Sequence, residues 1–188
     1  MKKIVMILVM VSTLFSCQNK NPKTQQVNEV VLKQQSDSLT QLAQLAIMKN
    51  LKEAMIKGGD PYAIEFCNLE AINLTNSVIK EQHLSIQRLS DKNRNPENNL
   101  KTAMDKDLFE LFKDDKALQD TLLYDNHNYI YYKRINLAMG TCLKCHASSK
   151  SIAPNVLTKL DELYPNDLAK NYSLNDFRGL WKITYENN

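Results

Sequence analysis

The stretch that most restricts the fold and function of this chain is GTCLKCHASS, residues 140–149. It contains two cysteines separated by two residues and a histidine directly after the second cysteine. At this spacing Cys142 and Cys145 can each add to one vinyl group of a single porphyrin. His146 is then held against one face of the ring, where its imidazole can bind iron. The motif occurs once, so it predicts one covalent haem c with His146 as an axial ligand.

The first residues have the pattern of a bacterial export signal. A basic start (MKK) precedes an apolar run over residues 4–15, which is shorter than the roughly 20 residues that span a bilayer. The sequence LFSC, ending at Cys17, resembles the lipobox in which the cysteine is lipidated and becomes the mature N-terminus. We therefore expect residues 1–16 to be a lipoprotein signal peptide. Lipidation at Cys17 then anchors the protein to a membrane of the cell envelope, facing the periplasm.

Two segments are expected after the signal. Residues 17–37 are polar and lack apolar periodicity, which predicts a flexible tether. Residues 38–188 are expected to form one c-type haem domain. The chain has 24 Lys and Arg against 21 Asp and Glu, a formal net charge of +3 to which two lysines of the signal contribute. No basic surplus points to nucleic acid as a partner.

Three other uses of the cysteine motif are alternatives to covalent haem. A zinc site usually has four protein ligands, whereas Cys142, Cys145 and His146 provide three. A thioredoxin-like redox pair lies at a helix start in a βαβ unit, and no such pattern precedes the motif. A structural disulfide between Cys142 and Cys145 is the third. Haem attachment takes place outside the cytoplasm, so the export signal favours haem over all three.

The rest of the chain predicts an α+β fold, with helices first and then a small antiparallel sheet. An apolar stripe predicts a helix from about residue 38 that ends at Gly58-Gly59, and Asp60-Pro61 begins a second helix. Further helices are expected at 100–115 and 153–165, and strands at 84–89, 129–135 and 177–186. The first helix is expected to bury Leu39, Leu42, Leu45, Leu51 and Met55, and the helix at 100–115 to bury Leu108, Leu111 and Phe112.

The sixth ligand of a haem iron is less constrained by sequence. The candidates are Cys67, Met104, Met139, His83 and His127. Cys67 lies on the apolar stripe of the second helix and is the odd cysteine that no other feature explains. The alternative for Cys67 is a small buried hydrophobe.

Four pieces of the chain resemble, in order, a family of exported bacterial single-haem c-type domains with a PAS-like fold. The family has long been catalogued as a domain of unknown function and is also found fused to histidine kinases. The pieces are AIEFCNLEA (63–71), RLSDKNRNPENN (88–99), CLKCH (142–146) and YPNDLAKNYSLNDFRGLWKITY (164–185). Two departures are Asn175, where the family often has glycine, and the absence of a proline after Asn98.

The resemblance implies a PAS-like antiparallel sheet with N-terminal helices packed on it, and His146 and Cys67 as the two axial ligands. A thiolate ligand stabilises ferric iron and lowers the reduction potential. Arg88 and Arg94 are candidates to pair with the haem propionates, because guanidinium binds carboxylates in a fork.

The expected function is redox or ligand sensing, or electron transfer to a protein partner, rather than catalysis. The alternatives are a haem-free PAS-like binding module with a Cys142–Cys145 disulfide, and a weak peroxidase.

Overall fold

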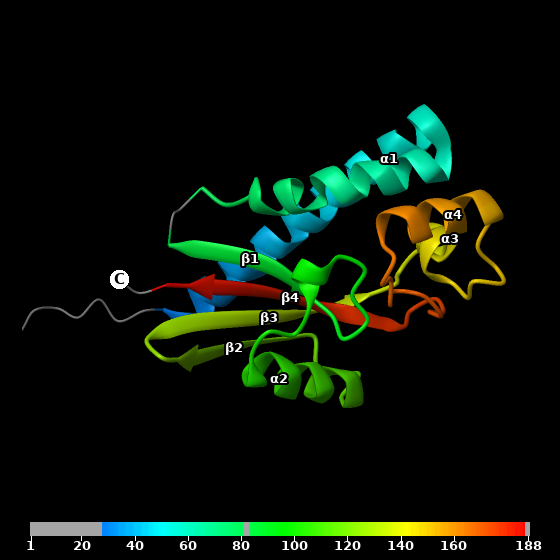
Figure 1. Ribbon diagram of the computed structural model, residues 1–188. Helices are drawn as coiled ribbons and strands as arrows, with labels where there is room; N and C mark the ends of the chain where they lie inside the picture. Colours follow the sequence, from blue (N-terminus) through cyan, green and yellow to red (C-terminus); the bar gives the residue numbers. More distant parts are fainter. Residues whose placement is uncertain (1–27, 81–82, 187–188) are drawn as a thin grey trace, which may run out of the picture.

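A four-stranded antiparallel sheet forms the centre of the molecule, in the order β1-β4-β3-β2. The structure, a computed structural model, describes residues 28–80 and 83–186. The strands are β1 (Leu84–Leu89), β2 (Asp120–Asp125), β3 (Asn128–Asn136) and β4 (Phe177–Tyr185). Helix α1 (Glu29–Asn76) covers one face and α2 (Ala103–Asp114) the other, as Figure 1 shows. The predicted α+β class, with an N-terminal helix packed on the sheet, is confirmed.

Helix α1 is broken at Gly59, where φ is 77° and ψ is −173°. That conformation costs glycine little and most other residues much. Figure 1 shows the chain turning back here, so that the second half of α1 runs alongside the first. The prediction of a helix end at Gly58-Gly59 and a new helix start at Asp60-Pro61 is confirmed.

The first half of α1 begins earlier than the sequence predicted. Residues 17–37 were expected to be a tether, but the helix starts at Glu29, and Asn28 caps it by accepting hydrogen bonds from the backbone of Val30 and Val31. Ser36 is fully buried, and its hydroxyl lies 2.8 Å from the Tyr185 hydroxyl on β4. Residues 29–37 therefore belong to the domain. The predicted signal peptide and Cys17 lie outside the described residues.

The buried face of this first half also differs from the predicted stripe. Leu42 and Leu45 are 54% and 65% exposed, whereas Thr40 and Ala43 are almost fully buried and Ile47 lies next to them. Small side chains on this row let the helix approach the sheet closely. The predicted stripe was therefore wrong for Leu42 and Leu45, whereas Leu39, Leu51 and Met55 are partly buried as predicted.

The sheet has a separate core on each face. Toward α1 the buried side chains are Ile86, Tyr131, Trp181, Ile183 and Tyr185. Toward α2 they are Leu89, Phe109, Phe112, Ile130, Tyr132 and Leu180. Alternate residues of β3 and β4 enter opposite cores, as the period of a strand requires.

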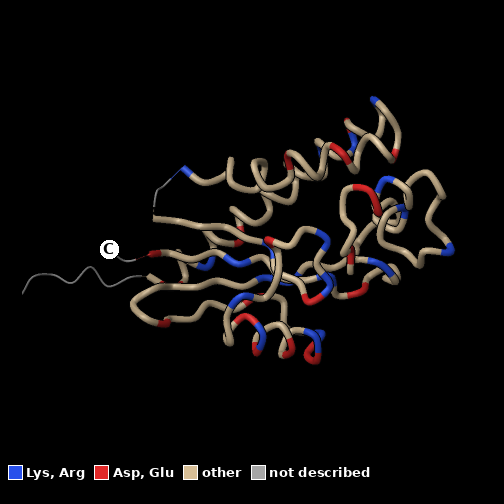
Figure 2. Tube along the Cα trace, in the orientation of Figure 1, with Lys and Arg blue, Asp and Glu red and all other residues tan. Residues whose placement is uncertain are grey.

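Helix α2 begins with a capping box between Thr102 and Asp105. Its outer surface carries acidic and basic positions (Figure 2). The prediction for its inner face was partly wrong, because Leu111 is 50% exposed and Phe109 is buried instead. Within the described residues no helix is both long and apolar enough to cross a membrane.

The cysteine motif lies at the end of the sheet. A 3-10 turn, η2 (Gly140–Cys142), continues into the short helix α3 (Leu143–His146), and α4 (Pro154–Leu163) follows. Ile64 of α1 packs with Ile152, Val156, Leu160 and Tyr164, and Cys145 packs against this cluster. The second half of α1 and the cysteine motif are thus held by one core.

Candidate functional site

A cavity of about 240 Å³ lies between α1, the end of the sheet and α3. Cys67, Cys142, Cys145 and His146 all line it. The three cysteines are free thiols and each is half-buried. Residues that are as many as 79 positions apart in the sequence are therefore brought to one cavity, and these include Cys67, which the resemblance had placed opposite His146.

His146 is held in one orientation by a backbone carbonyl. Its Nδ1 lies 2.7 Å from the carbonyl oxygen of Ala169. A carbonyl only accepts hydrogen bonds, so Nδ1 carries the proton and Nε2 keeps its lone pair. Burial, reinforced by the positive charges of Arg94 and Arg178, lowers the pKa of His146 well below its ordinary value. The ring is therefore uncharged, and its Nε2 lone pair is available to bind a metal. Metal-binding histidines are commonly oriented in this way.

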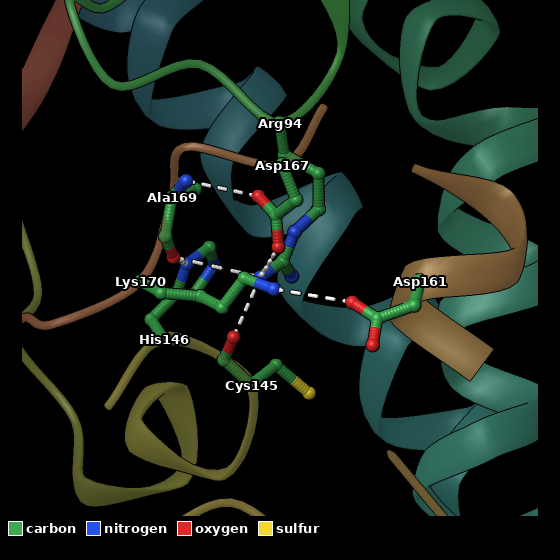
Figure 3. Close-up of polar contacts among 7 residues, drawn as sticks. All are labelled: Arg94, Cys145, His146, Asp161, Asp167, Ala169 and Lys170. Carbon is green, nitrogen blue, oxygen red and sulfur yellow. Dashed lines mark hydrogen bonds and ion pairs between the residues drawn. The ribbon is translucent and has the colours of Figure 1, made fainter. Parts of the chain in front are cut away.

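Arg94 connects the turn that carries Cys145 and His146 to the segment before β4. Its Nη2 donates to the carbonyl of Cys145 at 2.6 Å and to Asp167 at 3.0 Å, and Ala169 O lies 3.5 Å away. The Asp167 side chain is fully buried, and its other oxygen accepts a hydrogen bond from the Ala169 amide. Figure 3 shows these contacts converging beside His146. The charge of Arg94, predicted to face a propionate, is therefore already paired within the protein.

Two ion pairs fix the half of α1 that carries Cys67. Lys144 of α3 pairs with Asp60 at 3.0 Å, and Lys159 of α4 pairs with Glu65 at 2.8 Å. Asp60 and Glu65 both lie within about two helical turns of Cys67 along α1. The cysteine is therefore held on the wall of the cavity by contacts with the same segment that carries the motif.

Two thiols of the cavity, those of Cys67 and Cys145, have raised pKa values because they are buried. Burial raises the pKa of Cys67, and the charges of Arg88 and Arg94 oppose that rise in part. Burial also raises the pKa of Cys145, to about 11. A metal ion at the site would stabilise the thiolate of Cys67 instead, because thiolate is the form that binds metals.

The other predicted axial ligands do not line the cavity. Met104 packs in the core on the α2 side of the sheet, and Met139 is 42% exposed before η2. His83 and His127 are also outside the lining residues. The sequence reasoning missed two other sulfur donors, Met48 and Met55, which do line it. The sequence feature that could have indicated them is their spacing of three and four residues from Leu51 on the first half of α1.

The residues present fit a flat metal-bearing macrocycle with acidic substituents. A neutral imidazole and three thiols lie in one cavity with an apolar wall of Ile47, Leu51, Ile64 and Leu137. Arg88, Arg94 and Arg178 line it as well, and none of its lining residues in the described part of the chain is Asp or Glu. In residues 28–80 and 83–186 no three His, Cys, Asp or Glu side chains are grouped so as to bind a bare metal ion.

The sequence of this chain matches a known protein family, and its fold matches a solved structure. Residues 14–185 match the family described as Tll0287-like. A solved structure, the crystal structure of the cyanobacterial heme-protein Tll0287, superposes with a TM-score of 0.63 and 19% sequence identity. The match covers 86% of this chain and 98% of that one, and at such low identity it shows a common fold. No curated protein matches the chain.

Proposed function

The chain belongs to the Tll0287-like family, and from that premise we propose that it is a haem protein with one covalently attached haem c. The observation that carries the proposal is the orientation of His146, whose Nδ1 bonds Ala169 O at 2.7 Å in a cavity shared with Cys67, Cys142 and Cys145. A haem contributes an iron that can change oxidation state or bind a small ligand. The solved relative is titled a heme-protein, which supports the cofactor class.

In the proposed arrangement Cys142 and Cys145 would form the thioether links to the haem, and His146, through Nε2, and Cys67, as thiolate, would be the ligands of its iron. With both ligands bound the iron would have no open position, so sensing or electron transfer is a better fit than peroxidase chemistry. An anionic sulfur ligand also stabilises ferric iron and lowers the reduction potential.

We further propose that lipidation at Cys17 tethers the protein to a membrane of the cell envelope, facing the periplasm. The LFSC sequence supports this, and so does the site, because haem c is attached outside the cytoplasm. A redox or signalling protein is then the expected partner. Mass spectrometry of the chain purified from membranes tests the tether: a diacylglyceryl group on Cys17 is expected, and an unmodified Cys17 or an intact signal would contradict it.

Covalent haem is tested directly. The mature chain is expressed in the periplasm together with a haem-attachment system, and its denatured band is stained for haem. A stained band that disappears in Cys142→Ala/Cys145→Ala is expected. If the wild-type chain carries no haem, the protein is a haem-free module, and a disulfide between Cys142 and Cys145 becomes the alternative to measure.

The distal ligand is tested by three variants of side chains that line the same cavity. Cys67→Ser is expected to change the ferric absorption spectrum and to raise the reduction potential, and Met48→Leu and Met55→Leu are matched controls that should leave both unchanged. Carbon monoxide is expected to bind the reduced variant faster than the reduced wild type. A Cys67→Ser spectrum identical to that of the wild type, with a change in Met48→Leu, would identify a thioether ligand instead.

A further inference from the structure

The proposed haem cavity has more positive than negative charge in its wall. Arg88 of β1, Arg94 of the following loop and Arg178 of β4 line it, and its lining contains no Asp or Glu. A guanidinium withdrawn from water without a counter-ion is costly. The excess of cations therefore needs an explanation in terms of what the cavity binds.

Only one of these three arginines is paired with a carboxylate in the described part of the chain. Arg94 forms an ion pair with the buried Asp167 at 3.0 Å. Arg178 donates from Nη1 to the hydroxyl of Ser90 at 2.7 Å and lies over the ring of Tyr172 at 5.3 Å. Arg88 lies over the ring of Trp181 at 5.9 Å. Aromatic rings and a hydroxyl orient these two guanidinium groups but do not neutralise them.

The fold brings Arg88 and Arg178 together at the end of two paired strands. In the register of β1 and β4, Leu89 faces Leu180, and the hydroxyl of Ser90 donates to the carbonyl of Arg178 at 2.9 Å. A Cβ on Gly179 would meet the Leu89 carbonyl oxygen at 2.2 Å, so only glycine permits this close approach. The pKa of each arginine is lowered, first by burial and further by a neighbouring arginine.

We propose that Arg88 and Arg178 are the side chains that bind the two carboxylates of the haem, and that Arg94 is a positioning residue for the Cys145–His146 turn. This inference rests on the proposed haem binding. Two neighbouring guanidinium groups that form no ion pair within the described residues match two carboxylates in charge and in hydrogen-bond geometry. The sequence had indicated Arg88 and Arg94 for this role; the contacts favour Arg178 over Arg94.

The pairing predicts that the haem carboxylates stay ionised across the neutral range. The other titratable or charged groups described around the two arginines are Cys67 on α1, His146 on α3, Arg94 and Asp167 in loops, Tyr164 after α4 and Tyr172 before β4. With both arginines present, the reduction potential of the holoprotein should be nearly independent of pH between about 5 and 8, because the ordinary carboxyl pKa lies near 4 and cations lower it.

The test is the reduction potential of the purified holoprotein, titrated at several pH values. Arg178→Gln and Arg88→Gln should each lower the potential at pH 8, because a positive charge that favours the reduced iron is lost. Each should also acquire a potential that rises as the pH falls, because the less stabilised carboxylate takes up a proton with the electron. Lys150→Gln removes an exposed positive charge near the motif and should match the wild type in both respects.

Arg94→Gln separates the positioning role from the binding role. It should reduce the stability of the holoprotein and leave the pH dependence of the potential like that of the wild type. If both glutamine variants fold poorly, Arg88→Lys and Arg178→Lys keep the charge but lose the fork, and the propionate bending band in their resonance Raman spectra should shift.

The outcomes are distinguishable. A wild-type chain without covalent haem would overturn the proposed function and this inference together. A haem-loaded wild type, with Arg88→Gln and Arg178→Gln both matching Lys150→Gln, would overturn the inference alone. So would lysine variants with unshifted propionate bands.

Discussion

Replacement of Arg94 by glutamine is expected to destabilise the domain strongly. Arg94 joins its own loop to the turn of Cys145, through the Cys145 carbonyl, and to the segment before β4, through the Asp167 carboxylate and the Ala169 carbonyl. The Asp167 side chain has no exposed surface and that of Arg94 is 14% exposed, so water cannot replace the lost partner. Breaking a buried ion pair from one side costs about 3–5 kcal/mol, because it leaves an unpaired charge in the interior.

The structure places the expected loss near the middle of that range. Asp167 keeps the hydrogen bond from the Ala169 amide at 2.9 Å, which limits the penalty. The lost bond to the Cys145 carbonyl adds about 0.5–1.5 kcal/mol. The sum is about 4 kcal/mol in the free energy of unfolding. For a domain of this size that corresponds to a melting temperature lower by roughly 8–16 °C.

Urea denaturation followed by far-ultraviolet circular dichroism measures this loss. The double variant Arg94→Gln/Asp167→Asn removes the stranded charge and should recover about half of it, which tests the cause as well as the size. A single variant that loses less than about 1 kcal/mol, or a double variant no more stable than the single one, would refute the reasoning from a buried unpaired carboxylate.

Two further predictions concern residues that pack in or against the sheet. Gly179→Ala should lower the free energy of unfolding by about 1–3 kcal/mol, because the new Cβ would lie 2.2 Å from the Leu89 carbonyl oxygen. Gly140→Ala is the control, because its Cβ would meet nothing within 4 Å, and equal stability of the two variants in thermal unfolding would contradict the clash. Burial acts to raise the pKa of Asp105, but hydrogen bonds from Lys182 and Tyr132 outweigh it and the pKa is lowered. The stability that Asp105 contributes is therefore present above its ordinary pKa of about 4 and is lost as the pH falls through the folded value. The stability difference between wild type and Asp105→Asn should shrink on acidification below about pH 4, and a constant difference would contradict this.

Strong local patterns predicted most elements of the fold. Alternation in LSIQRL predicted β1 with its observed ends, and the glycine pair predicted the break in α1. Strand β2 (Asp120–Asp125) was missed because it is an edge strand whose residues are partly buried except for the exposed Tyr124, which gives no alternation. The start of α1 was missed because Ser36 and Thr40 occupy buried positions. Their hydroxyls bond the carbonyls of Leu32 and Asp37, so polar residues behave there as small core residues.

The candidate site was predictable where the residues lie close together in sequence. The cysteine motif indicated Cys142, Cys145 and His146, and the structure brings them together with Cys67 in one cavity. The role proposed for Arg178 could not be read from the sequence, because it depends on β4 lying beside β1. Likewise, nothing local shows that Arg94 has a buried carboxylate 73 positions away.

The order of the strands has a consequence for the timing of assembly. The central strand β4 comes last in the chain and pairs with both β1 and β3, and Tyr185 contacts Ser36 across a separation of 149 residues. Contacts of such long range form slowly, and here they cannot form at all until residues 177–185 have been synthesised. Cys142 and Cys145 are synthesised earlier, before the strand that carries Arg178 can complete the cavity. On the haem proposal, the thiol pair is therefore accessible to an attachment enzyme before the last strand closes the cavity.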